Sequence, residues 1–382
     1  MIYLDYNATT PLCDAAREAM LPYLDRYFGN PSSVHAAGRE ARAAIDDARD
    51  KLAELLHAKP SEIIFTSGAT ESCNLGVLGL ARSSSHGRHI ISNKAEHHAV
   101  LNPVEHLESR EGFEVTWLDV SKDGMIDLDQ LADSIRSDTK LVSIMTANNE
   151  TGVIQPMREI SRICRDHGVL LHSDIVQAFG KINVDVSLVD AGSFAAHKFY
   201  GPKGTGFLFL RSGLPIQPIM FGGAHENQRR PGTENVAGVA GMAAAADWML
   251  RDTDAERQRQ AQLRNELWRR IASVFPDAEE NGDQAHRLAN TLNTSFIGVD
   301  SETMLMALDL EGVCASSGSA CMVGSVRASH VLLAMGLPME SARSAIRFSL
   351  GRRTTAEEIA SAADALGRIA KRTKDAREYA VA

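Results

Sequence analysis

Short apolar runs alternate with helix-like segments through the first 250 residues of this 382-residue chain. The apolar runs, which we predict to be buried strands, lie at 62–66, 89–92, 113–119, 141–146, 169–173 and 207–210. The segments that we predict to be helices lie at 69–81, after residue 97, at 128–136 and at 157–167. This alternation indicates an α/β fold with a mostly parallel central sheet and flanking helices. Ligands of such sheets bind at the carboxyl ends of the strands.

The pattern changes near residue 250. Residues 237–246 are rich in Ala and Gly, and we interpret them as a buried helix. Leu263, Leu267 and Ile271 are then spaced four apart in a charged segment, as in an amphipathic helix. A second α+β unit follows. We predict two domains, with a large one at residues 11–250 and a small α+β one made of residues 1–10 and 251–382.

Composition and charge limit the class of protein. Apolar residues make up 44% of the chain, enough to build a core, so we exclude disorder as its main state. The net charge of −9 has the wrong sign for general binding of nucleic acid or an anionic membrane. We see neither a signal-peptide pattern nor an apolar stretch of about 18 residues, and therefore expect a cytoplasmic location.

Cysteine usage agrees with that location. The chain has an odd number of cysteines at wide spacings: Cys13, Cys73, Cys164, Cys314 and Cys321. Such a set does not predict a disulfide framework. It predicts that the protein is in a reducing compartment.

Three segments at strand ends carry candidate chemistry. The sequence TSGATE at 66–71 places Gly and hydroxyl residues at the start of a helix, where a phosphate binds well; a plain Ser or Thr N-cap is the alternative. Asp174 follows the strand at 169–173 and points into the predicted crevice, or else caps a helix. Lys198 follows an apolar strand and precedes a Gly/Pro turn, where burial favours a Schiff-base lysine; a Lys reaching the surface is the alternative.

Together these three segments match one cofactor. Pyridoxal phosphate needs a lysine for its aldehyde, an acid facing its pyridinium nitrogen and a cradle for its phosphate. We therefore predict that Lys198, Asp174 and the 66–71 segment bind it.

Four further residues fit this chemistry, each with a simpler alternative. His97 follows the strand at 89–92 and is placed to stack on the cofactor ring, or is one of a surface His pair. Asn149 lies in a polar turn at the same sheet edge. Arg347 is suited to a substrate carboxylate, or is a surface Arg on an edge strand. Cys321 lies among small residues in a predicted loop, where access favours reactivity over simple packing.

Metal chemistry is not expected. The sequence has no C-x-x-C, and the His225-Glu226 pair has no second His at the spacing of a zinc protease.

At this point the chain resembles a known family, the cysteine desulfurases of the NifS/IscS type. These are fold-type-I pyridoxal-phosphate enzymes of the class-V aminotransferase group. The resemblance runs from residue 3 to the last helix, in the motifs ATTP, FGNPSS, TSGATES, EHHAV, NNETG, HKFYGPKG, RRPGTEN, SSGSAC and IRFSLGR.

The resemblance implies a role for each matching residue. Lys198 would carry the cofactor, Asp174 would face the pyridinium, Gln177 would bond the ring hydroxyl and His97 would stack on the ring. Ala69, Thr70 and His197 would hold the phosphate, and Thr233 would reach the phosphate of the neighbouring subunit in a homodimer. Asn149 would contact the ring or the substrate carboxylate, which Arg347 would bind. Cys321 would take sulfur from L-cysteine as a persulfide and leave alanine.

The same resemblance implies partners. The persulfide sulfur would pass to an acceptor protein in iron–sulfur cluster assembly, tRNA thiolation or DNA sulfur modification. A selenocysteine lyase, or another class-V enzyme that works without the thiol, is the alternative activity.

The chain departs from the family pattern at two places. The family usually has Ser two residues before the His of the His-Lys pair, and this chain has Ala195. We expect weaker cofactor binding in consequence. Met322 and Val323 follow the thiol, and Arg327 stands where the family has an acidic residue. We expect a less mobile loop or an unusual acceptor.

Overall fold

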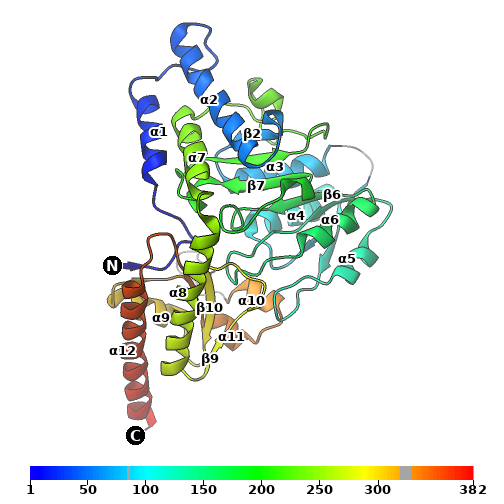
Figure 1. Cartoon of the computed structure of the whole chain (residues 1–382). Helices are drawn as coiled ribbons and strands as arrows, with labels where there is room; N and C mark the ends of the chain where they lie inside the picture. The colour runs from blue at the N-terminus through cyan, green and yellow to red at the C-terminus, as the bar shows by residue number, and fades with distance from the viewer. Residues whose placement is uncertain (84–86, 319–327, 382) are drawn as a thin grey trace.

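A seven-stranded sheet forms the centre of the computed structural model, which describes residues 1–83, 87–318 and 328–381 (Figure 1). Across the sheet the strands are β2 (Ile63–Thr66), β8 (Gly206–Leu210), β7 (Ala191–Ala195), β6 (Leu170–Asp174), β5 (Thr139–Ser143), β3 (His89–Asn93) and β4 (Glu114–Leu118). The pairs from β4 through β7 are parallel, and β8 is antiparallel to both β2 and β7. The predicted mostly parallel sheet is confirmed. The strand expected at 141–146 begins and ends earlier, as β5.

Both faces of this sheet are buried, which explains its uninterrupted apolar strands. In β2, Ile63 and Phe65 join one core, whereas Ile64 joins the other. Two helices cover the face of Ile64: α3 (Ala69–Ala81) and α4 (His98–Glu111). The opposite face is covered by α2 (Ala36–Leu55), α5 (Leu128–Ser134), α6 (Met157–Asp166) and α7 (Val236–Met249).

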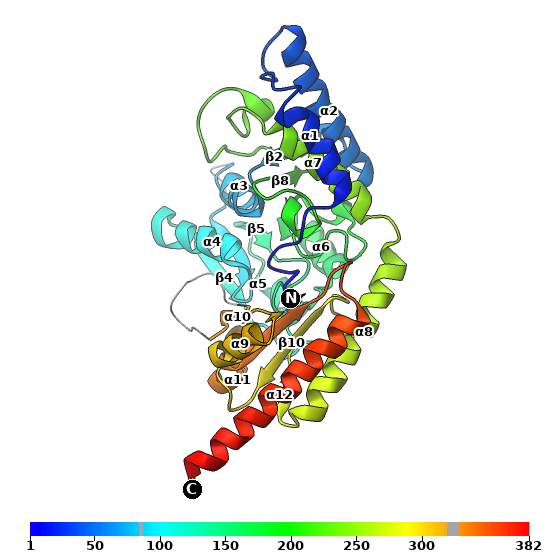
Figure 2. The ribbon, with the colours of Figure 1, turned by 90° about the vertical axis from the view of Figure 1, so that its left-hand side faces the viewer.

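Two N-terminal helices were not predicted, α1 (Asp14–Leu24) and α2. In α2, Ala41, Ile45, Ala48 and Leu52 are buried at helical spacing, and both helices pack on α7. Figure 2 shows α1, α2 and α7 together at one end of the molecule.

The C-terminal part has sheets of its own. The antiparallel sheet contains β12 (Ala345–Ser349), β10 (Thr291–Phe296) and β9 (Ala278–Glu280). β1 (Ile2–Tyr3) pairs with β11 (Val313–Cys314), so the first residues of the chain lie with its last third. The remaining helices are α8 (Thr253–Val274), α9 (Ser301–Leu310), α10 (His330–Ala334), α11 (Met339–Arg343) and α12 (Ala356–Val381).

Helices α8 and α12 run side by side over this part (Figures 1 and 2). The chain passes from α7 to α8 between Met249 and Thr253, next to the predicted boundary at residue 250. The division into two domains stays a prediction.

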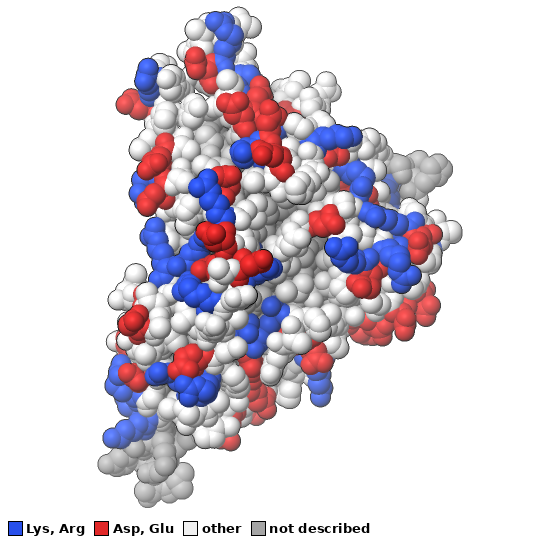
Figure 3. All heavy atoms as spheres, viewed as in Figure 1, with Lys and Arg blue, Asp and Glu red and all other residues white. Residues whose placement is uncertain are grey.

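Charges of both signs are interspersed over the face shown in Figure 3. Within the described ranges, none of the helices has the length and apolar character needed to cross a membrane.

Candidate active site

A cavity of about 660 Å³ lies at the carboxyl ends of the central strands, where the sequence places the ligand. It brings together most of the residues predicted for the site: Ala69, Thr70, His97, Asn149, Asp174, Gln177, His197, Lys198 and Arg347. Thr233 is exposed and does not line this cavity. Cys321 lies outside the described residues, although Gly318, which precedes its segment, lines the cavity wall.

Lys198 ends the short 3-10 helix η3 (Ala196–Lys198), which directly follows β7. Its Nζ donates hydrogen bonds to the carbonyl oxygens of Asn7 at 2.7 Å and Ala8 at 2.8 Å. The side chain therefore points into the cavity and does not reach out to the surface as the alternative would require.

Asp174 is the last residue of β6 and is buried at the base of the cavity. Its Oδ1 accepts from the backbone N–H of Val176 at 2.9 Å, and the Cys73 thiol lies 3.8 Å from Oδ2. Burial raises the pKa of Asp174 to about 6, against the lowering effect of that N–H and of Lys198. A cation bound beside this carboxylate would lower its pKa again and favour its ionised form.

His97 is held as a neutral imidazole. It is the N-cap of α4, and its Nδ1 accepts from the Ala99 N–H at 3.0 Å, which leaves the proton on Nε2. Burial, and next the charge of Lys198, lower the pKa of His97 to about 4. His98, in contrast, is exposed and stacks on His330 with the ring centroids 4.5 Å apart.

The start of α3 offers free backbone N–H groups to the cavity. Its N-cap is Gly68, which makes no side-chain cap bond, so the plain Ser or Thr cap is not what forms. Gly68 has φ +151°, and a Cβ on the neighbouring Gly206 would lie 2.7 Å from the Gly68 Cα. Backbone packing this tight leaves the N–H groups of Ala69 and Thr70 available for an anion.

His197 faces the same end of the cavity. Its Nδ1 lies 3.2 Å from Thr9 Oγ1, and burial, followed by the charge of Lys198, lowers its pKa to about 4. Glu71, also in the cavity wall, is neutralised by Arg230 at 2.7 Å.

β12 is an edge strand of its sheet, as the alternative for Arg347 assumed, but Arg347 is buried and is not a surface residue. It donates to Asp5 Oδ1 at 2.7 Å and to the Asn149 carbonyl at 3.0 Å. Within the described part of the chain, neither the buried Nε of Arg347 nor the buried Oδ1 of Asn149 has a hydrogen-bond partner. Both residues line the cavity, as residues of a site for a polar ligand would.

The structure adds residues that the sequence did not point to. Asn7 links the N-terminal segment to the site, because its carbonyl accepts from Lys198 and from Gln177 Nε2 at 2.9 Å. Lys181 is buried and donates to Asn7 Oδ1 at 3.0 Å and to Gln177 Oε1 at 2.5 Å. The spacing of four from Gln177 to Lys181 was the only signal for Lys181, and none pointed to Asn7.

Two buried acids lie behind the cavity. Glu96 Oε1 accepts from the Met145 N–H at 2.6 Å and from Asn93 at 3.0 Å, and burial raises its pKa to about 8. Glu150 accepts a hydrogen bond from Ser329 at 2.5 Å, and burial raises its pKa as well.

Comparison with known proteins gives the family of this chain. Residues 2–361 match the family described as Aminotransferase class-V. The chain belongs to this family. It is also 48% identical to "Cysteine desulfurase IscS" of Dictyoglomus turgidum, over 99% of this chain and 96% of the relative. "Putative cysteine desulfurase IscS 1" of Bacillus subtilis is 43% identical over 97% of this chain and 99% of the relative. Within class V the chain therefore groups with the cysteine desulfurases, as its motifs predict.

Solved structures show the same fold. A NifS-like protein, 37% identical, has a TM-score of 0.90 and covers 96% of this chain and 98% of its own. DndA from Streptomyces lividans is 39% identical and has a TM-score of 0.77; the match covers 90% of this chain and 97% of DndA. The predicted α/β architecture is confirmed.

Proposed function

We propose that this member of the cysteine desulfurases removes sulfur from L-cysteine, with pyridoxal phosphate held in the cavity and Cys321 as the sulfur carrier. Enzymes of class V use pyridoxal phosphate in general, and a solved relative, SspA, 34% identical, is described in complex with cysteine. The observation that carries the proposal is the convergence of Lys198, Asp174 and the uncapped start of α3 on one cavity.

The residues present fit this cofactor. Lys198 supplies the amine for its aldehyde, Asp174 the acid for its ring nitrogen, and Ala69, Thr70 and His197 surround the position for its phosphate. When bound, pyridoxal phosphate supplies an electron sink for the substrate carbon next to the amino group. The pyridinium would also lower the pKa of the buried Asp174 carboxyl and so favour its ionised form.

The other residues of the cavity would handle the substrate. Arg347, whose Nε has no hydrogen-bond partner among the described residues, would bind the L-cysteine carboxylate. His97, neutral with its proton on Nε2, would stack on the cofactor ring and move protons at that atom. Gln177 would donate to the ring hydroxyl.

In the net reaction the C–S bond of L-cysteine breaks and an S–S bond forms on Cys321. L-Cysteine and the enzyme thiol become L-alanine and an enzyme persulfide, so atoms and electrons balance without an added oxidant. Cys321 follows Gly318, a residue of the cavity wall, by three positions along the chain. The sulfur then passes to an acceptor protein.

We also propose a homodimer in the cytoplasm, with Thr233 completing the partner's phosphate site. Phe28, Val34 and Phe221 are 81%, 89% and 89% exposed at the same end of the molecule as α1 and α2, more than an isolated chain would favour. A second copy of the chain would cover them. Phe221→Asp should then shift sedimentation equilibrium toward the monomer; an unchanged dimer, or a monomeric wild type, would contradict this.

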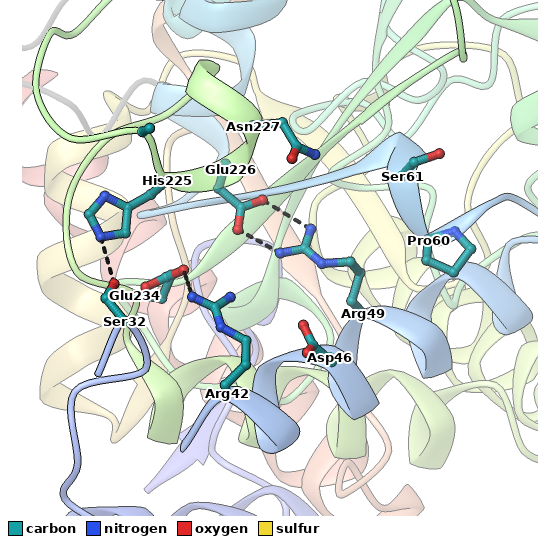
Figure 4. Close-up of a pocket in the computed structure, with 11 residues that line it drawn as sticks. Ser32, Arg42, Asp46, Arg49, Pro60, Ser61, His225, Glu226, Asn227 and Glu234 are labelled. Carbon is teal, nitrogen blue, oxygen red and sulfur yellow. Dashed lines mark hydrogen bonds and ion pairs between the residues drawn. The ribbon is translucent and has the colours of Figure 1, made fainter. Parts of the chain in front are cut away.

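A polar pocket of about 520 Å³ lies between α2 and the segment that carries Thr233 (Figure 4). Arg49 pairs with Glu226 at 2.6 Å, and Arg42 pairs with Glu234 at 2.9 Å. These ion pairs tie the 225–234 segment to α2, and Thr233 in this segment is exposed. Glu234 Oε2 lacks a hydrogen-bond partner within the described part of the chain.

The proposal is tested first by the cofactor linkage. The purified protein should show a visible absorbance band, and Lys198→Ala should abolish it. Lys51→Ala, which changes an exposed lysine on α2, is the control and should keep the band. A wild-type protein that shows no band after incubation with pyridoxal phosphate would overturn the proposal.

A further inference from the structure

Lys181 is an unusual lysine, because it is only 9% exposed and both of its hydrogen-bond partners are neutral oxygens. It lies four residues after Gln177, in the turns that follow β6. Burial, followed by the charges of Lys198 and Arg347, lowers the pKa of Lys181 well below its ordinary value. Burying a lysine beside two other cations is costly, so a role for it is worth seeking.

The contact between Lys181 and Gln177 fixes the orientation of the Gln177 amide. A lysine amine donates to an oxygen whether it is charged or neutral, and the Asn7 carbonyl on the other side of Gln177 can only accept, so the atom of Gln177 that faces Lys181 at 2.5 Å is the carbonyl Oε1. The amide nitrogen is then turned the other way, where it donates to the Asn7 carbonyl at 2.9 Å and borders the cavity. Gln177 can therefore present only a donor to a ligand.

Asn7 closes the network on the side of Lys198. Its Oδ1 accepts from Lys181 and from Asn290 at 3.0 Å each, and its carbonyl accepts from both Gln177 and Lys198. Lys181 thus holds two groups that contact or border the reactive amine.

We propose that Lys181 is a positioning residue that acts through Gln177, holding the amide as a hydrogen-bond donor to the ring oxygen of the cofactor and so setting the protonation of the Lys198–cofactor linkage. This inference rests on the proposed function. A donor aimed at the ring oxygen stabilises that oxygen as an anion and weakens the hold of the linkage on its proton. Loss of the donor should therefore shift the titration of the linkage to higher pH.

Other charged groups near Lys181 are the same in every variant below. Lys198 and Arg347 lie on its cavity side, and Glu256 and Arg257 line a small cavity that Lys181 also borders. A difference in titration midpoint between the variants is then due to the change at Lys181 or Gln177 itself.

The test uses the holoenzyme and the pH dependence of its visible absorbance band. Lys181→Met and Gln177→Ala should each move the midpoint upward by on the order of one pH unit. The shift of the double variant should equal the larger of the two single shifts, because both changes remove the same donor, the Gln177 amide. Lys140→Met is the matched control, since Lys140 is also 9% exposed but lies in β5 away from the cavity; its midpoint should equal that of wild type.

Gln177→Glu covers the case in which Lys181→Met does not fold. This variant keeps an oxygen against Lys181 and replaces the donor at the cavity by an acceptor, so its midpoint should also rise. Unchanged midpoints, or shifts that add in full in the double variant, would overturn the proposal. If the wild-type holoenzyme shows no band, the proposed function fails instead, so the two failures are distinguishable.

Discussion

Gly318 lies directly against the buried carboxylate of Glu150, which also accepts the hydroxyl of Ser329. Gly318 and Ser329 flank the segment that contains Cys321: Gly318 comes immediately before it, and Ser329 comes just after it. The carboxylate of Glu150, the residue after Asn149, therefore lies against the residue before that segment and is bonded to a residue just after it.

This contact makes Gly318 sensitive to substitution. A Cβ at Gly318 would lie 2.6 Å from Glu150 Oε2, and the residue has φ +79°. Gly318→Ala should lower the melting temperature and slow persulfide formation. Gly312→Ala is the control, because Gly312 has φ +78° and nothing within 4 Å of its Cβ position. Since both changes carry the same backbone strain, equal effects would show that the Glu150 contact is unimportant.

Glu96 predicts a pH dependence of stability. Its pKa is about 8 in the folded protein against an ordinary 4.5, so folding takes up a proton between these values. The free energy of unfolding should therefore fall as pH rises through this window, at up to about 1.4 kcal/mol per pH unit. Glu96→Gln removes this titration.

Urea unfolding of the wild type and of Glu96→Gln at pH 6 and pH 9 measures the effect. The wild type should lose stability relative to the variant at pH 9. A difference between the two proteins that is the same at both pH values would show that Glu96 does not hold its proton in the folded state.

The role proposed for His97 leads to predictions for kcat and for its dependence on pH. His97→Gln should lower kcat by roughly 10²–10⁴-fold, the usual contribution of a general acid–base residue. Because the pKa of His97 is lowered to about 4, its protonation should not limit the wild-type rate between pH 5 and 7. His98→Gln, at the exposed neighbour, should have a small effect; a larger loss there than at His97 would reverse the assignment.

Much of this site follows from the sequence, because strand ends and turn residues are local signals. Lys198, Asp174 and the 66–71 segment each lie at the end of an apolar strand. β6 and β7 are parallel, and β2 runs in the same direction because β8 is antiparallel to both β2 and β7, so the three ends meet at one edge. The alternatives for Arg347 were settled only by tertiary structure, since its burial depends on pairing of β12 with β10 and on Asp5. Asn7 and Lys181 could not be predicted, because their role arises when β1 pairs with β11, more than 300 residues away.

A substitution at Ala195 is predicted to strengthen the binding of pyridoxal phosphate. Ala195 is 1% exposed at the end of β7, opposite Gly206, which packs on the start of α3. A hydroxyl there would add one hydrogen bond to a charged phosphate, worth roughly 1.5–3 kcal/mol. Ala195→Ser should therefore lower the Kd for pyridoxal phosphate on titration of the apoenzyme by about tenfold or more.

Ala191→Ser is the control for this substitution, because it places the same hydroxyl at the opposite, distant end of β7. Binding by Ala195→Ser no tighter than wild type would mean that the missing family serine has been compensated.

The transfer of sulfur to Cys321 is the central claim, and a labelling experiment tests it most directly. Wild-type holoenzyme and Cys321→Ala are incubated with ³⁵S-labelled L-cysteine, and labelled peptides and alanine are measured. We predict label on the peptide that contains Cys321 in the wild type, and loss of both label and alanine in a variant that keeps its visible band. Undiminished alanine and sulfide release by Cys321→Ala would contradict the account and indicate a lyase that works without the thiol.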